Sequence, residues 1–140
     1  MAWGFCFERK QQQSRGGKAR ILLVDDDTRN LKLLEAQISS LGEEIHLATS
    51  GEKALEVVRG ADVDLVILDV MMPGLNGFET CRRIKGNEAT RQVPVILLTA
   101  LDDAESRLKG IESGADDFIS KPANKEELLA RTRSLVRVKR

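Results

Sequence analysis

Four short apolar runs in this sequence each end in a side chain that can take part in chemistry. In chain order these side chains are Asp25 with Asp26, Asp69, Thr99 and Lys121. Carboxylates gathered at one site repel each other and require a cation, and oxygen ligands with open positions suit Mg2+. A carboxylate beside such a cation can attack phosphorus, while a hydroxyl and an ammonium stabilise the phosphoryl oxygens. If the four runs converge, the sequence predicts a phosphoryl-transfer site with Asp69 as the nucleophile.

The spacing of apolar residues predicts the elements that position these side chains. Strands are expected over residues 21–24, 44–48, 65–68, 95–98 and 118–120, and helices over residues 31–41, 54–58, 78–84, 104–113 and 128–135. Strands that are apolar throughout and alternate with helices indicate a parallel sheet covered on both faces.

The first loop decides between the two common sheets of this kind. Three aspartates, Asp25 to Asp27, stand where a Rossmann fold would place its glycine-rich fingerprint. The predicted fold class is therefore an α/β, flavodoxin-like (βα)5 doubly wound parallel sheet with strand order 2-1-3-4-5. In this order the first and third strands are neighbours, and their carboxyl ends form the crevice where ligands bind.

Composition and charge limit the classes of protein. A chain of 140 residues with 41% apolar and 31% charged residues is one ordinary globular domain. Its net charge of zero combines +3 over residues 1–18, −8 over residues 19–130 and +5 over the last ten. The acidic body argues against direct nucleic-acid binding, and no apolar run is long enough for a membrane helix. The two cysteines, Cys6 and Cys81, are typical of a reducing, cytoplasmic location.

Four motifs together resemble the receiver (CheY-like) domain of two-component response regulators. They are Val24-Asp25-Asp26, Leu68-Asp69-Val70-Met71-Met72-Pro73-Gly74, Leu98-Thr99-Ala100 and Lys121-Pro122. The resemblance covers residues 19–138. It leaves residues 1–18 as a flexible leader and residues 139–140 as a basic end at which an output domain would begin.

The resemblance implies a role for each of these residues. Asp69 would be the phosphoacceptor, supplied by a histidine kinase or phosphotransfer protein. Mg2+, or Mn2+ in its place, would be held by Asp25, Asp26, Asp69 and the backbone carbonyl of Met71. Thr99 and Lys121 would contact the phosphoryl group, Thr99 and Phe118 would form the switch, and the Lys121–Pro122 peptide bond would be cis.

The resemblance also implies a signalling module whose only reactions are its own phosphorylation and dephosphorylation, and which is not a conventional enzyme. Its partner surface would be the fourth helix, fifth strand and fifth helix, which would contact an output domain or a second copy of the chain. The stretches 112–118 and 131–136 resemble receivers joined to cyclic-di-GMP enzymes. Met71 and Leu101 occupy positions that help to set the rate of phosphoryl hydrolysis; both are apolar and cannot orient water, so a long-lived aspartyl phosphate is expected.

Two other classes of protein remain as alternatives. Val24-Asp25-Asp26-Asp27-Thr28 partly imitates the signature of a haloacid-dehalogenase-type Mg2+-dependent phosphohydrolase, but Arg29 stands where that signature has its threonine. A flavodoxin-like electron carrier would need a glycine- and hydroxyl-rich first loop and aromatic residues around the flavin, and tyrosine is absent from the chain.

Overall fold

A computed structural model describes residues 18–100 and 104–139 and contains the predicted parallel sheet. The strands are β1 (Arg20–Val24), β2 (Glu44–Ala48), β3 (Leu65–Asp69), β4 (Val95–Thr99) and β5 (Asp117–Ser120). The helices are α2 (Thr28–Ile38), the 3-10 helix η1 (Ser39–Leu41), α3 (Gly51–Gly60), α4 (Gly77–Gly86), α5 (Ala104–Glu112) and α6 (Lys125–Lys139). The strand order β2-β1-β3-β4-β5, with all neighbours parallel, confirms the predicted fold class.

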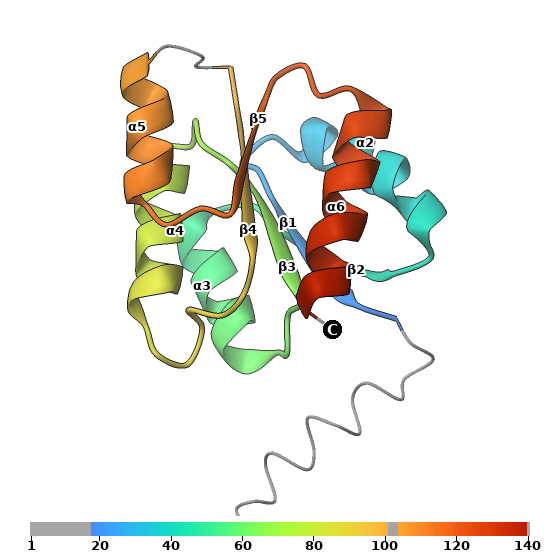
Figure 1. The fold of residues 1–140 in the computed structure, drawn as a ribbon, viewed down its shortest axis with the longest axis horizontal. Coiled ribbons are helices and arrows are strands. Elements are labelled where there is room, and N and C mark those ends of the chain that lie inside the picture. Colours follow the sequence, from blue (N-terminus) through green and yellow to red (C-terminus); the bar gives the residue numbers. More distant parts are fainter. Residues whose placement is uncertain (1–17, 101–103, 140) are drawn as a thin grey trace, which may run out of the picture.

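The helices cover both faces of the sheet, with α3, α4 and α5 on one side and α2 and α6 on the other (Figure 1). Each strand supplies both faces, because successive side chains of a strand point in opposite directions. In β1, Leu22 and Val24 join the apolar cluster with α3 and α4, whereas Ile21 and Leu23 join the cluster with α2 and α6. This double burial explains why the strands are apolar throughout.

Side-chain caps begin the helices where the sequence changes from apolar to polar. Asp27 Oδ1 accepts a hydrogen bond of 2.9 Å from the Arg29 backbone N–H at the start of α2. Ser50 caps α3, and Asn76 caps α4 by accepting from the Glu79 N–H at 2.9 Å. Such caps satisfy backbone donors that have no partner inside the helix. Among the described residues, no helix is long and apolar enough to cross a membrane.

The apolar residues of α6 predict a buried stripe of Leu128, Leu129 and Leu135, and the observed stripe differs. Leu128 is buried as expected, but Leu129 and Leu135 are only half-buried, and Thr132 and Val136 complete the stripe. Residues four apart lie above one another on a helix, so the stripe that begins at Leu128 continues through Thr132. The Thr132 Oγ1 atom is buried without a hydrogen-bond partner among the described residues.

We therefore expect Thr132→Val to raise the free energy of unfolding by about 1 kcal/mol, because it removes a buried hydroxyl without changing the shape of the side chain. Urea denaturation measures this change. Thr49→Val, at an exposed threonine, serves as the control and should change stability by less than about 0.5 kcal/mol. Destabilisation by Thr132→Val would show that the hydroxyl has a partner that stabilises the fold.

Candidate functional site

Two buried carboxylates and one lysine meet at the carboxyl edge of the sheet. Asp69, the last residue of β3, and Asp25, just after β1, are 3% and 1% exposed. Lys121 Nζ lies 2.5 Å from Asp69 Oδ1 and 3.7 Å from Asp25 Oδ2. Asp26 is exposed beside them. The structure therefore brings together four of the residues that the sequence singled out.

Backbone hydrogen bonds hold this edge in place. Asp25 Oδ1 accepts from the Asp27 N–H at 2.9 Å, which leaves its other oxygen directed to the site. The Lys121 N–H donates to the Thr99 carbonyl at 2.7 Å, so the end of β5 is tied to the end of β4. The Lys121–Pro122 peptide bond is cis.

The amino end of α4 approaches the end of β3 very closely. A Cβ atom at Gly77 would collide with the Asp69 backbone carbonyl oxygen and lie 2.6 Å from the Val70 Cα. Only a residue without a side chain fits at this approach. The preceding residues Pro73, Gly74 and Asn76 are typical of a turn, but the contact of Gly77 with β3 is a tertiary feature that the sequence does not reveal.

The carboxylates fit a divalent cation by their chemistry. One oxygen from each of Asp25, Asp26 and Asp69 lies within 4.8 Å of the others. Asp25 Oδ2 is buried and has no hydrogen-bond partner among the described residues. Oxygen ligands of this kind suit Mg2+. The Met71 side chain is 58% exposed at the start of the loop after β3, and the role of its carbonyl as a ligand stays a prediction.

The charge balance of the site affects both of its central groups. Burial raises the pKa of Asp69, and the nearby charges of Asp25 and Asp26 raise it further, although Lys121 opposes the shift. Burial alone would lower the pKa of Lys121, but its pairing with Asp69 and Asp25 prevails and raises this pKa. Lys121 is therefore held as a cation, while the site carries more negative charge than one lysine neutralises.

Thr99 and Phe118 belong to the opposite face of the sheet from Asp69. Asp69 continues the side of β3 that includes Leu65 and Ile67, which pack with α2 and α6. Thr99 is fully buried and continues the side of β4 that includes Leu97, which packs with α3 and α4. Phe118 pairs with Leu97 and packs on this second side. The two predicted switch residues thus share a face, and the acceptor lies on the other.

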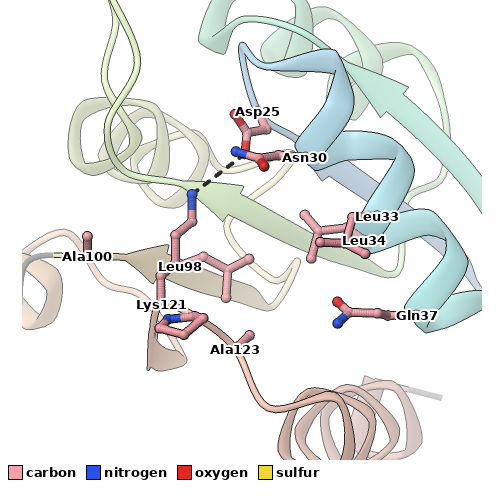
Figure 2. Close-up of a pocket in the computed structure, with 10 residues that line it drawn as sticks. Asp25, Asn30, Leu33, Leu34, Gln37, Leu98, Ala100, Lys121 and Ala123 are labelled. Carbon is pink, nitrogen blue, oxygen red and sulfur yellow. Dashed lines mark ion pairs between the residues drawn. The ribbon is translucent and has the colours of Figure 1, made fainter.

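A groove opens beside the acceptor cluster between α2 and the segment after β5 (Figure 2). Its volume is about 370 Å3, and Asp25 and Lys121 form its polar end. Its apolar wall includes Leu33, which is 60% exposed on α2, and Ala123 across the groove. The exposure of Leu33 could have been anticipated, because it lies off the helical stripe of Leu31 and Leu34, but the groove itself depends on how α2 packs.

The fold and the acidic cluster define an α/β domain with a candidate divalent-cation site at the carboxyl edge of a doubly wound parallel sheet. Comparison with known families specifies it further: the model of the response regulator receiver domain family matches residues 21–133. This chain belongs to that family. The match decides in favour of the receiver over the phosphohydrolase and the flavodoxin-like carrier.

Individual relatives agree with the family. Response regulator PleD of Caulobacter vibrioides is 47% identical over 121 residues, which are 86% of this chain and 27% of PleD. The DNA-binding dual master transcriptional regulator RpaA of Synechocystis is 38% identical over 84% of this chain and 49% of its own length. The chain therefore spans about a quarter to a half of these relatives.

Solved structures show the same fold. The receiver domain of the Francisella response regulator 1452 superposes with a TM-score of 0.81 at 28% identity, covering 88% of this chain and all of that one. The BeF3-activated receiver domain of DrrB superposes with a TM-score of 0.77 at 40% identity, covering 86% of this chain and 98% of that one.

The buried charge of Asp69 leads to a prediction about stability. Because the pKa of Asp69 is raised, its ionised carboxylate destabilises the folded state at a pH above that pKa. Asp69→Asn should therefore raise Tm at neutral pH in the absence of divalent cations. The expected rise is roughly 4 °C for each kcal/mol of destabilisation that the substitution removes. The gain should shrink as the pH falls through the pKa of Asp69, because the parent carboxyl then becomes neutral. Mg2+ should raise the Tm of the parent more than that of the variant.

Differential scanning calorimetry between pH 4 and pH 8 measures these changes. Asp27→Asn is the matched control, since asparagine caps α2 as well as aspartate does and this side chain lies outside the buried pair. A lower Tm for Asp69→Asn at neutral pH would contradict the interpretation of the charge balance.

Proposed function

We propose that this chain accepts a phosphoryl group on Asp69 in a Mg2+-dependent reaction and thereby switches a partner surface. The observation that carries the proposal is the buried Asp69 carboxylate paired with Lys121 at 2.5 Å, among carboxylates with an excess of negative charge. Burial and the neighbouring negative charges make the ionised form of the Asp69 carboxylate unfavourable. Once the excess negative charge around it is neutralised, such a carboxylate is a reactive nucleophile.

The proposed reaction transfers one phosphoryl group between two nucleophiles. An Asp69 carboxylate oxygen forms a bond to phosphorus, and the bond from phosphorus to the imidazole nitrogen of a phosphohistidine breaks. The electron pair of that bond leaves with the imidazole. Lys121 then neutralises a phosphoryl oxygen, and the Thr99 hydroxyl donates to another. Mg2+ held by Asp25, Asp26 and Asp69, with the Met71 carbonyl as a further ligand, would neutralise developing charge on the phosphoryl oxygens.

The donor would reach Asp69 along the groove in Figure 2. Its polar end is formed by Asp25 and Lys121, so a histidine seated there would present its phosphoryl group to the acceptor. The exposed Leu33 offers apolar contact to the protein that carries this histidine, a sensor kinase or phosphotransfer protein. A donor of this kind and the presence of only two cysteines are both consistent with a location of the chain in the reducing cytoplasm.

The surface that responds to phosphorylation would be formed by α5, β5 and α6, which are the fourth α-helix, the fifth strand and the fifth α-helix along the chain. Leu108 and Ile111 of α5 are 53% and 73% exposed, which is unusual for large apolar side chains in neighbouring turns of a helix. Arg131 of α6 pairs with Asp117 of β5 at 2.5 Å and so joins the two elements. An output domain or a second copy of this chain would contact this surface. The receiver would comprise residues 19–138; of the predicted leader, residues 1–17 lie outside the described residues.

Phosphorylation by acetyl phosphate tests the proposal directly. Incubation with acetyl phosphate and Mg2+ should add one phosphoryl group to the parent and to Asp27→Asn, and none to Asp69→Asn. Intact-mass spectrometry measures the adduct, which should be lost in base because it is an acyl phosphate. A parent that remains unmodified, although calorimetry shows that it binds Mg2+, would contradict the proposed function.

The lifetime of the adduct gives a second prediction. The exposed Met71 side chain cannot orient a water molecule, so Met71→Gln should shorten the half-life of the aspartyl phosphate severalfold, whereas Met71→Leu should leave it unchanged. The decay of the phosphorylated mass after removal of acetyl phosphate measures both. An equal half-life for the Gln and Leu variants would contradict the role of this position. Leu101, for which the same is expected, lies outside the described residues.

A further inference from the structure

Residues 48–51, which we call the β2–α3 connection, contact both of the loops that carry the acidic cluster. The Asp25 N–H donates a hydrogen bond of 3.2 Å to the carbonyl of Ala48, the last residue of β2. Gly51, the first residue of α3, is buried against Leu75 in the loop between β3 and α4. The same short segment therefore lies against the loop after β1 and against the loop after β3.

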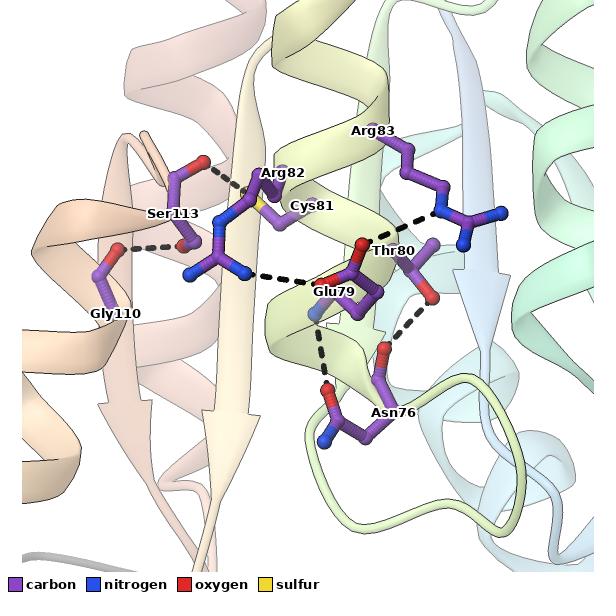
Figure 3. Close-up of polar contacts among 8 residues, drawn as sticks. All are labelled: Asn76, Glu79, Thr80, Cys81, Arg82, Arg83, Gly110 and Ser113. Atoms are coloured by element: carbon purple, nitrogen blue, oxygen red, sulfur yellow. Dashed lines mark hydrogen bonds and ion pairs between the residues drawn. The ribbon is translucent and has the colours of Figure 1, made fainter.

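Gly51 leaves room for the backbone of the loop after β3. An ideal Cβ atom at this residue would collide with the Thr80 Oγ1 atom and would lie 2.9 Å from the Leu75 carbonyl oxygen. Thr80 is fully buried, and its hydroxyl donates to the Asn76 carbonyl at 2.8 Å (Figure 3), so its side chain is held in place. An added methyl group at Gly51 would therefore displace the loop at Leu75.

A displacement of Leu75 would reach Met71, because the two ends of this loop share one hydrogen-bond acceptor. The Val70 carbonyl accepts from the Met72 N–H at 3.1 Å and from the Gly77 N–H at 3.0 Å. The N–H and the carbonyl of one trans peptide unit point in opposite directions. The hydrogen bond from the Met72 N–H therefore fixes the direction of the Met71 carbonyl. Gly77 follows Leu75 by two residues, so a shift of Leu75 acts on the shared acceptor.

We propose that the β2–α3 connection sets the affinity of the site for Mg2+, because it fixes the loop of Asp25 and the loop of Met71 relative to one another. The inference rests on the proposed function, which assigns Mg2+ ligands to both loops. Gly51 is a positioning residue in this proposal, since it acts through Leu75 and Thr80. Replacing a residue that orients a metal ligand typically weakens metal binding by about 10- to 100-fold.

An NMR titration of the 15N-labelled chain with MgCl2 tests the proposal without any phosphodonor. In Gly51→Ala the Mg2+ dissociation constant should rise about tenfold, because the displaced loop no longer presents the Met71 carbonyl to the ion that Asp25 binds. Gly60→Ala is the matched control, since this glycine of the same helix has no atom within 4 Å of an added Cβ. Equal dissociation constants for Gly51→Ala and Gly60→Ala would overturn the proposal.

A variant at a distant buried residue separates the loss of Mg2+ affinity from a general loss of stability. Val63 is 2% exposed and lies just before β3, at the end of that strand opposite Asp69. Val63→Ala should lower Tm, because it leaves a cavity, but it should not change the Mg2+ dissociation constant. If Val63→Ala weakened Mg2+ binding as much as Gly51→Ala does, the proposal would be wrong.

A substitution at Thr80 keeps the proposal testable if Gly51→Ala does not fold. Thr80→Val keeps the shape of the side chain but removes the hydrogen bond to the Asn76 carbonyl. The Mg2+ dissociation constant should then rise about two- to threefold, the loss expected for one weak hydrogen bond. An unchanged dissociation constant in Thr80→Val would then overturn the proposal.

The Mg2+ titration and the acetyl phosphate experiment can fail separately. If acetyl phosphate leaves the parent unmodified but Gly51→Ala still weakens Mg2+ binding, the role of the β2–α3 connection stands and the proposed function fails. If the parent accepts a phosphoryl group but Gly51→Ala binds Mg2+ as Gly60→Ala does, the proposed function stands and this inference fails. A parent whose signals do not respond to MgCl2 would contradict both.

Discussion

The site depends on the contact between one lysine and two buried carboxylates. Lys121 comes from the end of β5, and its partners Asp69 and Asp25 come from β3 and from the end of β1. Two negative charges and one positive charge in a buried place leave an excess of negative charge that the interior does not stabilise. A parallel sheet is suited to this arrangement, because it brings the ends of separated segments to one edge. The approach of α4 at Gly77 and the backbone bond between Lys121 and Thr99 hold that edge.

The alternation of side chains along the strands places Asp69 and Phe118 on different faces of the sheet. Asp69 belongs to the face covered by α2 and α6, and Thr99 with Phe118 belongs to the face covered by α3, α4 and α5. Asp69 and Thr99 are the last residues of β3 and β4, so a phosphoryl group on Asp69 would meet Thr99 at the edge of the sheet. The hydrogen bond from the Lys121 N–H to the Thr99 carbonyl joins the end of β5 to the end of β4 at this edge.

The sequence was sufficient for the strands and their order, because fully apolar runs bounded by turn residues leave few arrangements. It was also sufficient for the convergence of Asp25, Asp69 and Lys121, since each follows a strand directly. The sequence was not sufficient for features that depend on how the helices and strands pack against one another. The stripe of α6 runs through Thr132 and not through Leu129, and the contact of Gly110 with Phe118 joins residues of two elements whose spacing the sequence does not fix. An isolated glycine within the predicted helix 104–113 was the available signal.

A phenylalanine at the switch position limits how strongly either arrangement can be held. Its ring has no hydroxyl, so Phe118 is held where it lies only through packing and the attraction of the ring face to a cation. Arg107 supplies that cation on α5, and the attraction is worth about 0.5–1 kcal/mol at an exposed site. A phosphoryl group on Asp69 would replace a carboxylate of about −1 charge beside Lys121 by a group of about −1.5 to −2 charges. A weak hold of this kind on the ring is compatible with the proposed switch.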